Sequence, residues 1–154
     1  MDTKFAIFLI LTSATATASA DQEFVCGKSS VSIKIDHQLP LRSVEGADVI
    51  LRVERQDDRR FSLLRFGNID FIGGGCDEDA NGNARIIFQA YCGGSGCNDK
   101  SNWGVIDPTN LQQLIAPTDD SLKLVTHLLG HPPKLEGQMM SVSNEAHKYG
   151  LHTP

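Results

Sequence analysis

The chain has few aromatic residues and no excess of basic ones, and both shortages narrow its class. Of its 154 residues only 6% are aromatic, and the formal net charge is −5. A nucleic-acid binder needs a basic surface to neutralise phosphates, so this balance argues against that class. The 40% hydrophobic and 21% charged residues also differ from the composition of a disordered tail or a membrane protein. The composition indicates one small soluble domain.

Long hydrophobic runs are missing beyond the first residues. Residues 5–11 are apolar, follow Lys4, and lead into small residues that end in A-x-A at positions 18–20. This pattern is typical of a cleaved export signal, and the run is well short of the about 20 apolar residues that span a bilayer. We expect a signal peptide at residues 1–20 and a single β-rich domain at residues 21–154. The protein would be periplasmic or secreted, without stable membrane insertion.

Cysteine is scarce but even in number: the four residues are Cys26, Cys76, Cys92 and Cys97. In an oxidising compartment this predicts paired structural disulfide bonds, although sequence alone does not choose among the three pairings. We favour Cys92–Cys97, because the glycine-rich residues 93–96 between them allow the tight backbone path of a small ring. Cys26 and Cys76 would then form the second bond.

Alternation of apolar and polar residues predicts that most of the chain is β-strand. The strand candidates are residues 31–35, 47–54, 61–66, 68–72, 84–91, 103–107 and 111–116. Asn81-Gly82, between two of these candidates, is a strong hairpin signal. Glycine is concentrated from residue 73 to residue 104. We expect loops, bulges and tight turns in that region.

Near the C-terminus the period of the apolar residues changes. Apolar positions from Leu122 to Leu129 fall three and four apart, after an Asp/Ser start and before Gly130 and Pro132. This predicts one short helix near residues 120–129. Residues 138–142 as an edge strand and residues 144–149 as a last helical turn remain open. The expected fold class is mainly β, an antiparallel sandwich- or barrel-like sheet with one short helix, stabilised by disulfide bonds.

No motif in the sequence predicts a catalytic centre: H-E-x-x-H, C-x-x-C and G-x-S-x-G are all missing. Asp77, Asp79 and Asn81, followed by Gly82, resemble the first half of a calcium loop. The twelfth position of such a loop supplies a bidentate Glu, but here it is Phe88. Calcium is therefore kept only as a weak alternative to a polar hairpin turn, and no other cofactor or metal is predicted.

The glycine-rich segment after Cys92 is the favoured surface for binding another protein. A loop held at both ends by a disulfide bond loses little conformational entropy when it binds. For Trp103 the favoured role is core packing beside this loop, and surface recognition is the alternative. The predicted partner-binding residues are Gly93, Gly94, Ser95, Gly96, Asn98, Asp99, Lys100 and Trp103.

The function we expect is protein binding in the periplasm, with an inhibitor or immunity protein that occludes a cell-wall-degrading enzyme as the most concrete form. Many such enzymes are basic, and an acidic protein is steered toward them. One alternative is a small periplasmic hydrolase whose site is assembled by the fold. The other is an envelope structural or assembly protein that receives a partner's strand at a sheet edge.

Overall fold

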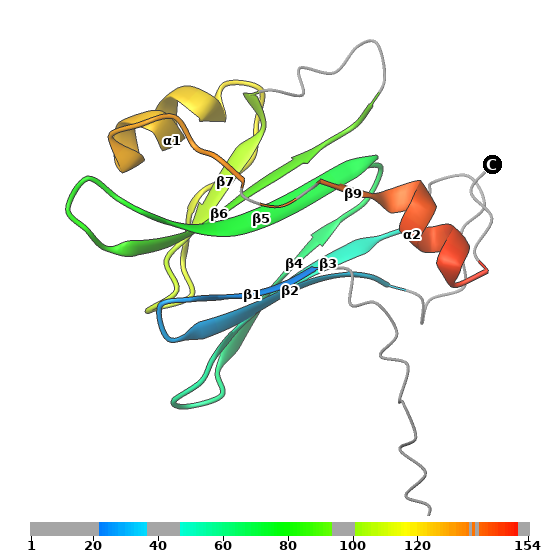
Figure 1. Ribbon diagram of the computed structural model, residues 1–154, viewed down its shortest axis with the longest axis horizontal. Helices are drawn as coiled ribbons and strands as arrows, with labels where there is room; N and C mark the ends of the chain where they lie inside the picture. The colour runs from blue at the N-terminus through cyan, green and yellow to red at the C-terminus, as the bar shows by residue number, and fades with distance from the viewer. Residues whose placement is uncertain (1–21, 37–46, 94–100, 136, 138, 151–154) are drawn as a thin grey trace, which may run out of the picture.

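The computed structural model describes residues 22–36, 47–93, 101–135, 137 and 139–150. Within these ranges the chain is mainly β, with two antiparallel sheets packed face to face and two helices (Figure 1). The expected class is confirmed, and the described strands form a sandwich and no closed barrel. The predicted signal peptide at residues 1–20 lies outside the described residues. In the part of the chain that is described, no helix has the length and apolar character to cross a membrane.

The first sheet has four strands in sequence order. They are β1 (Gln22–Cys26), β2 (Ser29–Ile35), β3 (Val49–Arg55) and β4 (Phe61–Phe66), and each pairs antiparallel with the next. The period-two pattern points one set of side chains at the second sheet, and Ile33, Leu51 and Val53 there are fully buried. The alternate set, including Ser30, Ser32 and Arg52, lies on the opposite face.

The second sheet has five strands in the order β8-β7-β6-β5-β9. They are β5 (Phe71–Glu78), β6 (Ala84–Tyr91), β7 (Trp103–Ile106), β8 (Gln113–Ile115) and β9 (Met140–Ser141). β5 and β6 form the hairpin that Asn81-Gly82 predicts, and Gly82 has the positive φ of 78° that such a turn requires.

The expectation that the glycines from residue 73 onward lie in loops is wrong for four of them. Gly73, Gly74 and Gly75 belong to β5, and Gly104 belongs to β7. A Cβ on Gly74 would lie 3.1 Å from the side chain of Phe24 on the inner face. A Cβ on Gly73 would lie 2.7 Å from the sulfur of Met139 on the outer face. Glycine is therefore used here because other groups approach the strand closely on both faces.

A disulfide bond joins the two sheets. Cys26 on β1 is bonded to Cys76 on β5, as the sequence predicts. The cysteines are 50 residues apart, and closing a loop of this length stabilises the fold by about 4 kcal/mol in the chain-entropy model. Cys92 is also disulfide-bonded. Its predicted partner, Cys97, lies outside the described residues, so the Cys92–Cys97 pairing stays a prediction.

Two helices accompany the sheets, where the sequence led us to expect one. The predicted helix is α1 (Ser121–Leu129), which ends at Gly130 in a left-handed conformation. The second helix, α2 (Val142–Lys148), follows β9 directly and is capped by the Ser141 hydroxyl, which accepts a hydrogen bond from the Asn144 N–H. A C-terminal edge strand followed by a helix was one of the open alternatives, and both elements are present.

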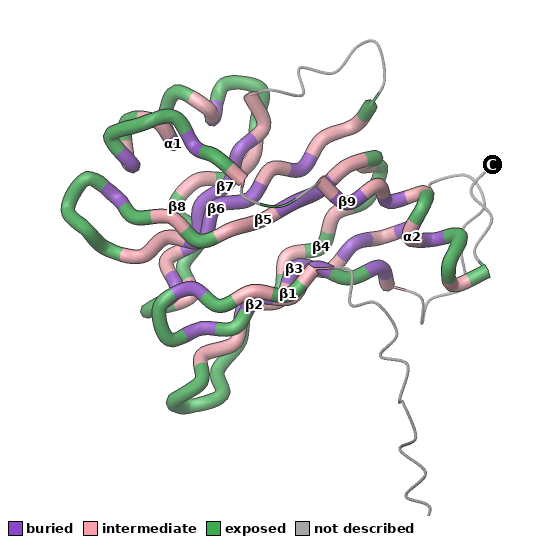
Figure 2. Tube along the Cα trace, in the orientation of Figure 1, coloured by how far each residue is buried: buried purple, intermediate pink, exposed green. Residues whose placement is uncertain are grey.

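Buried residues form two cores (Figure 2). The larger core lies between the sheets, and Phe88 at its centre contacts the Phe66 ring edge to face, with 5.7 Å between ring centroids. The smaller core lies under α1, where Val125 and Leu129 pack on Trp103 of β7. α1 thus covers part of the outer face of the five-stranded sheet. Among the described elements, no helix covers the outer face of the four-stranded sheet (Figure 1).

Candidate binding surfaces

The segment predicted to bind a partner is fixed firmly at its N-terminal end. Cys92 is disulfide-bonded, and the Gly93 N–H donates a short hydrogen bond to the Asp70 carboxylate. The Asp70 N–H in turn donates to the Tyr91 carbonyl at 3.0 Å. The rings of Phe71 and Tyr91 lie 5.3 Å apart, which adds a side-chain contact between the two strands. The chain therefore leaves β6 along a path set by both main-chain and side-chain contacts.

Ser121 holds the chain at the C-terminal end of the predicted partner-binding segment. This residue is fully buried at the start of α1, and its hydroxyl accepts a hydrogen bond from the Trp103 N–H at 2.9 Å. The same hydroxyl lies 2.9 Å from the Ser101 carbonyl and 2.8 Å from the Thr118 carbonyl. One side chain thus joins the beginning of β7 to the beginning of α1.

Of the predicted partner-binding residues, the structure describes Gly93 and Trp103. Gly93 is exposed, whereas Trp103 is only 7% exposed and packs in the core under α1. Trp103 thus takes the core position that was favoured from the sequence, and it can serve a binding segment only by holding its end in place. Gly94, Ser95, Gly96, Asn98, Asp99 and Lys100 lie outside the described residues.

The stretch that resembles a calcium loop is organised by Asp79. Its carboxylate, with a side chain only 3% exposed, accepts hydrogen bonds from the N–H groups of Asn81 and Asn83 at 2.9 Å and pairs with Arg85 at 2.7 Å. The hydrogen bond from the Asn83 N–H is the main reason that the pKa of Asp79 falls to about 2. These contacts give Asp79 the role of closing the β5–β6 turn.

The other two residues of that stretch are arranged differently. Asp77 Oδ1 lies 3.5 Å from His131 Nε2, and Asn81 is exposed at the tip of the turn. Among the described residues, no three side chains of His, Cys, Asp or Glu gather closely enough to hold a metal ion.

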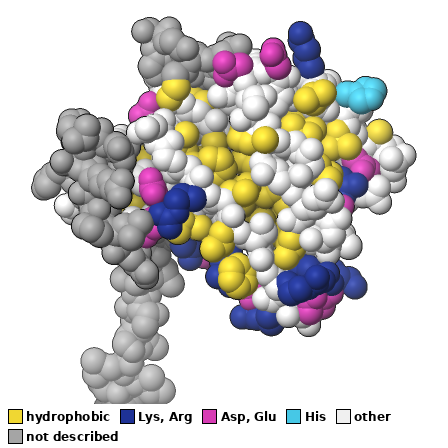
Figure 3. Space-filling model, turned by 180° about the vertical axis from the view of Figure 1, so that it is seen from behind, with side chains coloured by type: hydrophobic (Ala, Val, Ile, Leu, Met, Phe, Trp, Pro, Cys, Tyr) yellow, Lys and Arg dark blue, Asp and Glu magenta, His cyan; other side chains and the backbone are white. Residues whose placement is uncertain are grey.

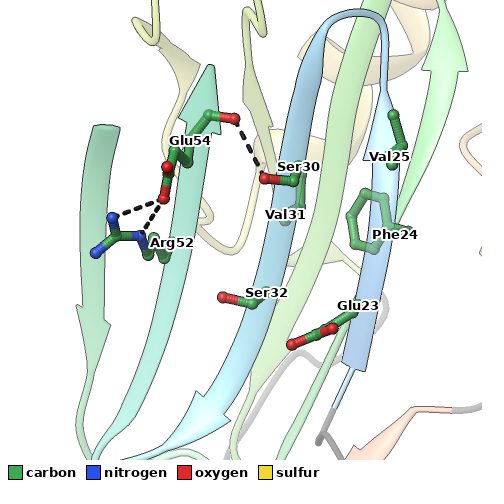
Figure 4. Close-up of a pocket in the computed structure, with 8 residues that line it drawn as sticks. All are labelled: Glu23, Phe24, Val25, Ser30, Val31, Ser32, Arg52 and Glu54. Atoms are coloured by element: carbon green, nitrogen blue, oxygen red, sulfur yellow. Dashed lines mark hydrogen bonds and ion pairs between the residues drawn. The ribbon is translucent and has the colours of Figure 1, made fainter. Parts of the chain in front are cut away.

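A groove follows β2 on the outer face of the four-stranded sheet (Figure 4). The small side chains of Ser30 and Ser32 form its floor, between Glu23 and Val25 on β1 and Arg52 and Glu54 on β3. Its volume is about 330 Å³. The serines at alternate positions of the sequence SSVSIKI predict the polar face of a strand. Their small size is the sequence signal for a groove on that face.

The charged residues beside this groove are paired with each other. Arg52 donates two hydrogen bonds to one carboxylate oxygen of Glu54, at 2.7 and 3.2 Å, and its guanidinium lies 4.1 Å from the centroid of the Phe61 ring. Arg59 also pairs with Glu54, at 2.8 Å. Glu23, on the other side of the groove, pairs with Lys34 at 2.7 Å. The groove therefore offers serine hydroxyls and charged side chains that each have an ion-pair partner.

Comparison with known proteins adds no further assignment. No protein-family model, curated protein or solved structure matches this chain. The fold nevertheless defines a class, that of a disulfide-linked β-sandwich of two antiparallel sheets.

Proposed function

We propose that this protein is an exported protein-binding module that inhibits a cell-wall-degrading enzyme by occluding its active-site cleft. The observation that carries the proposal is the fixation of both ends of residues 94–100. Asp70 holds Gly93 at one end, and the buried Ser121 holds Trp103 at the other. These contacts connect the segment to the five-stranded sheet and to α1.

The advantage of such an arrangement is thermodynamic. Ordering a flexible loop on binding costs about 0.5–1.5 kcal/mol for each immobilised side chain, in addition to the backbone cost. A segment whose ends are already fixed avoids part of that cost. A net charge of −5 favours a basic partner, because complementary charge increases the rate of encounter.

The proposed location is the periplasm or the secreted fraction. The Cys26–Cys76 bond supports this, since disulfide bonds persist in oxidising compartments and are rare in the cytosol. The export pattern at residues 1–20 supports it independently. An immunity protein against a competitor's wall-degrading enzyme and an inhibitor of the cell's own enzyme share this location and mechanism.

The test uses the oxidised chain from residue 21 to residue 154 and a panel of purified basic wall-degrading enzymes: muramidases, amidases and endopeptidases. Release of soluble fragments from peptidoglycan is measured against inhibitor concentration. The expected result is saturable inhibition of at least one enzyme at one inhibitor per enzyme. Full activity of every enzyme at a large excess of the chain would overturn the proposal.

The role of the segment is tested separately with Ser95→Trp. A bulky side chain in an inserted segment should weaken inhibition by about 100-fold, the effect of disrupting a central contact of an interface. Thr109→Trp is the matched control, because Thr109 is an exposed hydroxyl residue in the turn after β7 and lines neither candidate surface. Equal inhibition by both variants would show that residues 94–100 do not enter the cleft.

A further inference from the structure

β4 combines two features of a strand that pairs with another chain. It is the last strand of the four-stranded sheet, so within the described part of the chain one side of its backbone faces no strand of that sheet. Its outward-facing residues Phe61 and Leu63 are 52% and 51% exposed. Proteins usually protect such an edge with Pro, a bulge, charged side chains or a covering element. The sequence FSLLRF contains no Pro, and its single charged residue, Arg65, is paired within its own chain with Asp36 and Asp48. Seen from the side opposite to Figure 1, hydrophobic side chains gather across the middle of the molecule and charged ones toward its rim (Figure 3).

The hydrogen-bond pattern identifies which backbone groups of β4 face outward. The Arg55 N–H donates to the Arg60 carbonyl at 2.9 Å, which fixes the phase of the β3–β4 ladder. Because antiparallel pairing alternates, every second residue of β4 from Ser62 onward exchanges hydrogen bonds with β3. The N–H and C=O groups of Phe61, Leu63 and Arg65 therefore point to the open side. These are also the residues whose side chains lie on the exposed outer face.

We propose that the open edge of β4 binds β4 of a second copy of this chain, antiparallel and two-fold symmetric about Leu63. The four-stranded sheets of the two copies would then form one continuous sheet of eight strands. A symmetric pair of identical edges gives a closed dimer, the commonest form of homo-oligomer. Addition of a strand at a sheet edge supplies main-chain hydrogen bonds whatever the side chains, and the side chains determine which strand is accepted.

The side chains of β4 favour a copy of β4 in this register. Leu63 lies opposite Leu63 of the second copy, and Phe61 lies opposite Arg65. The Leu63 pair is apolar and favourable, and the aliphatic part of the Arg65 side chain can pack beside Phe61 while its guanidinium keeps the carboxylate partners of its own chain. Moving the centre of symmetry to Arg65 would place two arginines opposite each other. The register about Leu63 is also the one that uses all three outward-facing backbone positions of both strands.

The charges near this edge do not oppose the contact. The Arg65 guanidinium is neutralised within its own chain by Asp48 at 2.9 Å and by Asp36 at 3.0 Å. On the inner side of the strand, Leu64 and Phe66 pack against the main core but are only partly buried. A strand added beside β4 would cover both of them. The same contact would thus remove apolar surface from water on both faces of the edge.

Sedimentation velocity of the oxidised chain tests the proposal. The wild type should convert from monomer to dimer with rising concentration, and Leu63→Lys, which places two ammonium groups opposite each other, should dimerise at least tenfold more weakly. Leu124→Lys is the matched control, because Leu124 is a 60% exposed leucine on α1, and it should behave as the wild type. A wild type that stays monomeric up to about 1 mM would overturn the proposal.

Hydrogen exchange locates the contact without a mutation. Exchange of the amides of Phe61, Leu63 and Arg65 should slow as the dimer fills, whereas the amides of exposed turns should not change. A dimer that leaves these three amides exchanging at the monomer rate uses another surface, and that result too would overturn the proposal. The outcome is separable from the proposed inhibition, because Leu63→Lys leaves residues 94–100 and both of their fixed ends unaltered.

Discussion

Gly104 offers a sharp test of how the five-stranded sheet is assembled. On β7 it lies directly opposite Phe88 of β6, and the Phe88 ring turns over it into the main core. A Cβ at position 104 would collide with three carbons of that ring. Phe88 is fully buried and has Phe66 against it, so the ring has little space into which it can move. The substitution Gly104→Ala therefore forces a rearrangement in the main core between the two sheets.

The cost follows from what must move. Adding a methyl group to a well-packed core destabilises a protein by about 1–3 kcal/mol, and a clash with a fixed aromatic ring belongs at the upper end, about 3 kcal/mol. In thermal unfolding this corresponds to a Tm lower by roughly 10 °C for a domain of this size. Urea unfolding of the oxidised protein, followed by tryptophan fluorescence, measures the free energy of unfolding directly, because Trp103 is the single tryptophan and is buried.

Two further variants separate this explanation from a general effect of alanine. Gly137→Ala is the control, because a Cβ there meets no atom of the described residues within 4 Å, and its stability should stay within about 0.5 kcal/mol of the wild type. Phe88→Leu should restore part of the stability of Gly104→Ala, with a coupling of at least about 1 kcal/mol in a double-mutant cycle. If Gly104→Ala unfolds at the same urea concentration as the wild type, the Phe88–Gly104 register is wrong.

Two other perturbations test the contacts around the candidate surfaces. Ser121→Ala removes a buried hydroxyl that accepts a hydrogen bond from the Trp103 N–H. It should lower the free energy of unfolding, measured in urea, by about 1–3 kcal/mol. An unchanged unfolding midpoint would contradict the role of Ser121 in joining β7 to α1. The pKa of Asp79 is lowered to about 2, below its ordinary value of 3.8. Its contribution to stability is therefore complete above about pH 5 and is lost as the pH falls toward 2. Acid unfolding followed by circular dichroism should show a shallower loss of stability for Asp79→Asn. If Asp79→Asn loses stability at acid pH as steeply as the wild type, Asp79 does not cause that loss.

The strands were predictable because their signals are local, whereas the Cys26–Cys76 bond followed only from the preference for a small Cys92–Cys97 ring. Alternation in residues 31–35 and 61–66 requires one buried face, and Asn81-Gly82 requires a tight turn, whatever the rest of the chain does. The glycines of β5 were not predictable in this way. Their positions depend on Phe24 and Met139, which are distant in sequence and approach the strand from opposite faces.

The candidate surfaces were less predictable than the strands. Alternation shows that Phe61 and Leu63 share a face of β4, but two apolar residues at alternate positions usually indicate the buried face. In β4 this inference fails, because Ser62, Leu64 and Phe66 face the core and Phe61 and Leu63 face outward. Only the order of the strands, with β4 last, shows that these outward residues lie at an unpaired edge. The hydrogen bond between Ser121 and Trp103 could not be predicted either, since nothing in the sequence relates these two residues, which are 18 positions apart.

The two sheets divide the proposed tasks between them. The five-stranded sheet carries α1 on its outer face, and contacts within this part of the fold hold Gly93 and Trp103 on either side of residues 94–100. The four-stranded sheet contributes the face that no described helix covers and the β4 edge. A dimer through β4 would therefore leave both copies of the binding segment unused by the dimer contact. Two such segments in one dimer raise the effective concentration of the second once the first is bound, so avidity toward an enzyme fixed on an insoluble wall would exceed the affinity of one copy. Leu63→Lys separates the two contributions: inhibition of a soluble enzyme should be unchanged, while inhibition on intact walls should fall.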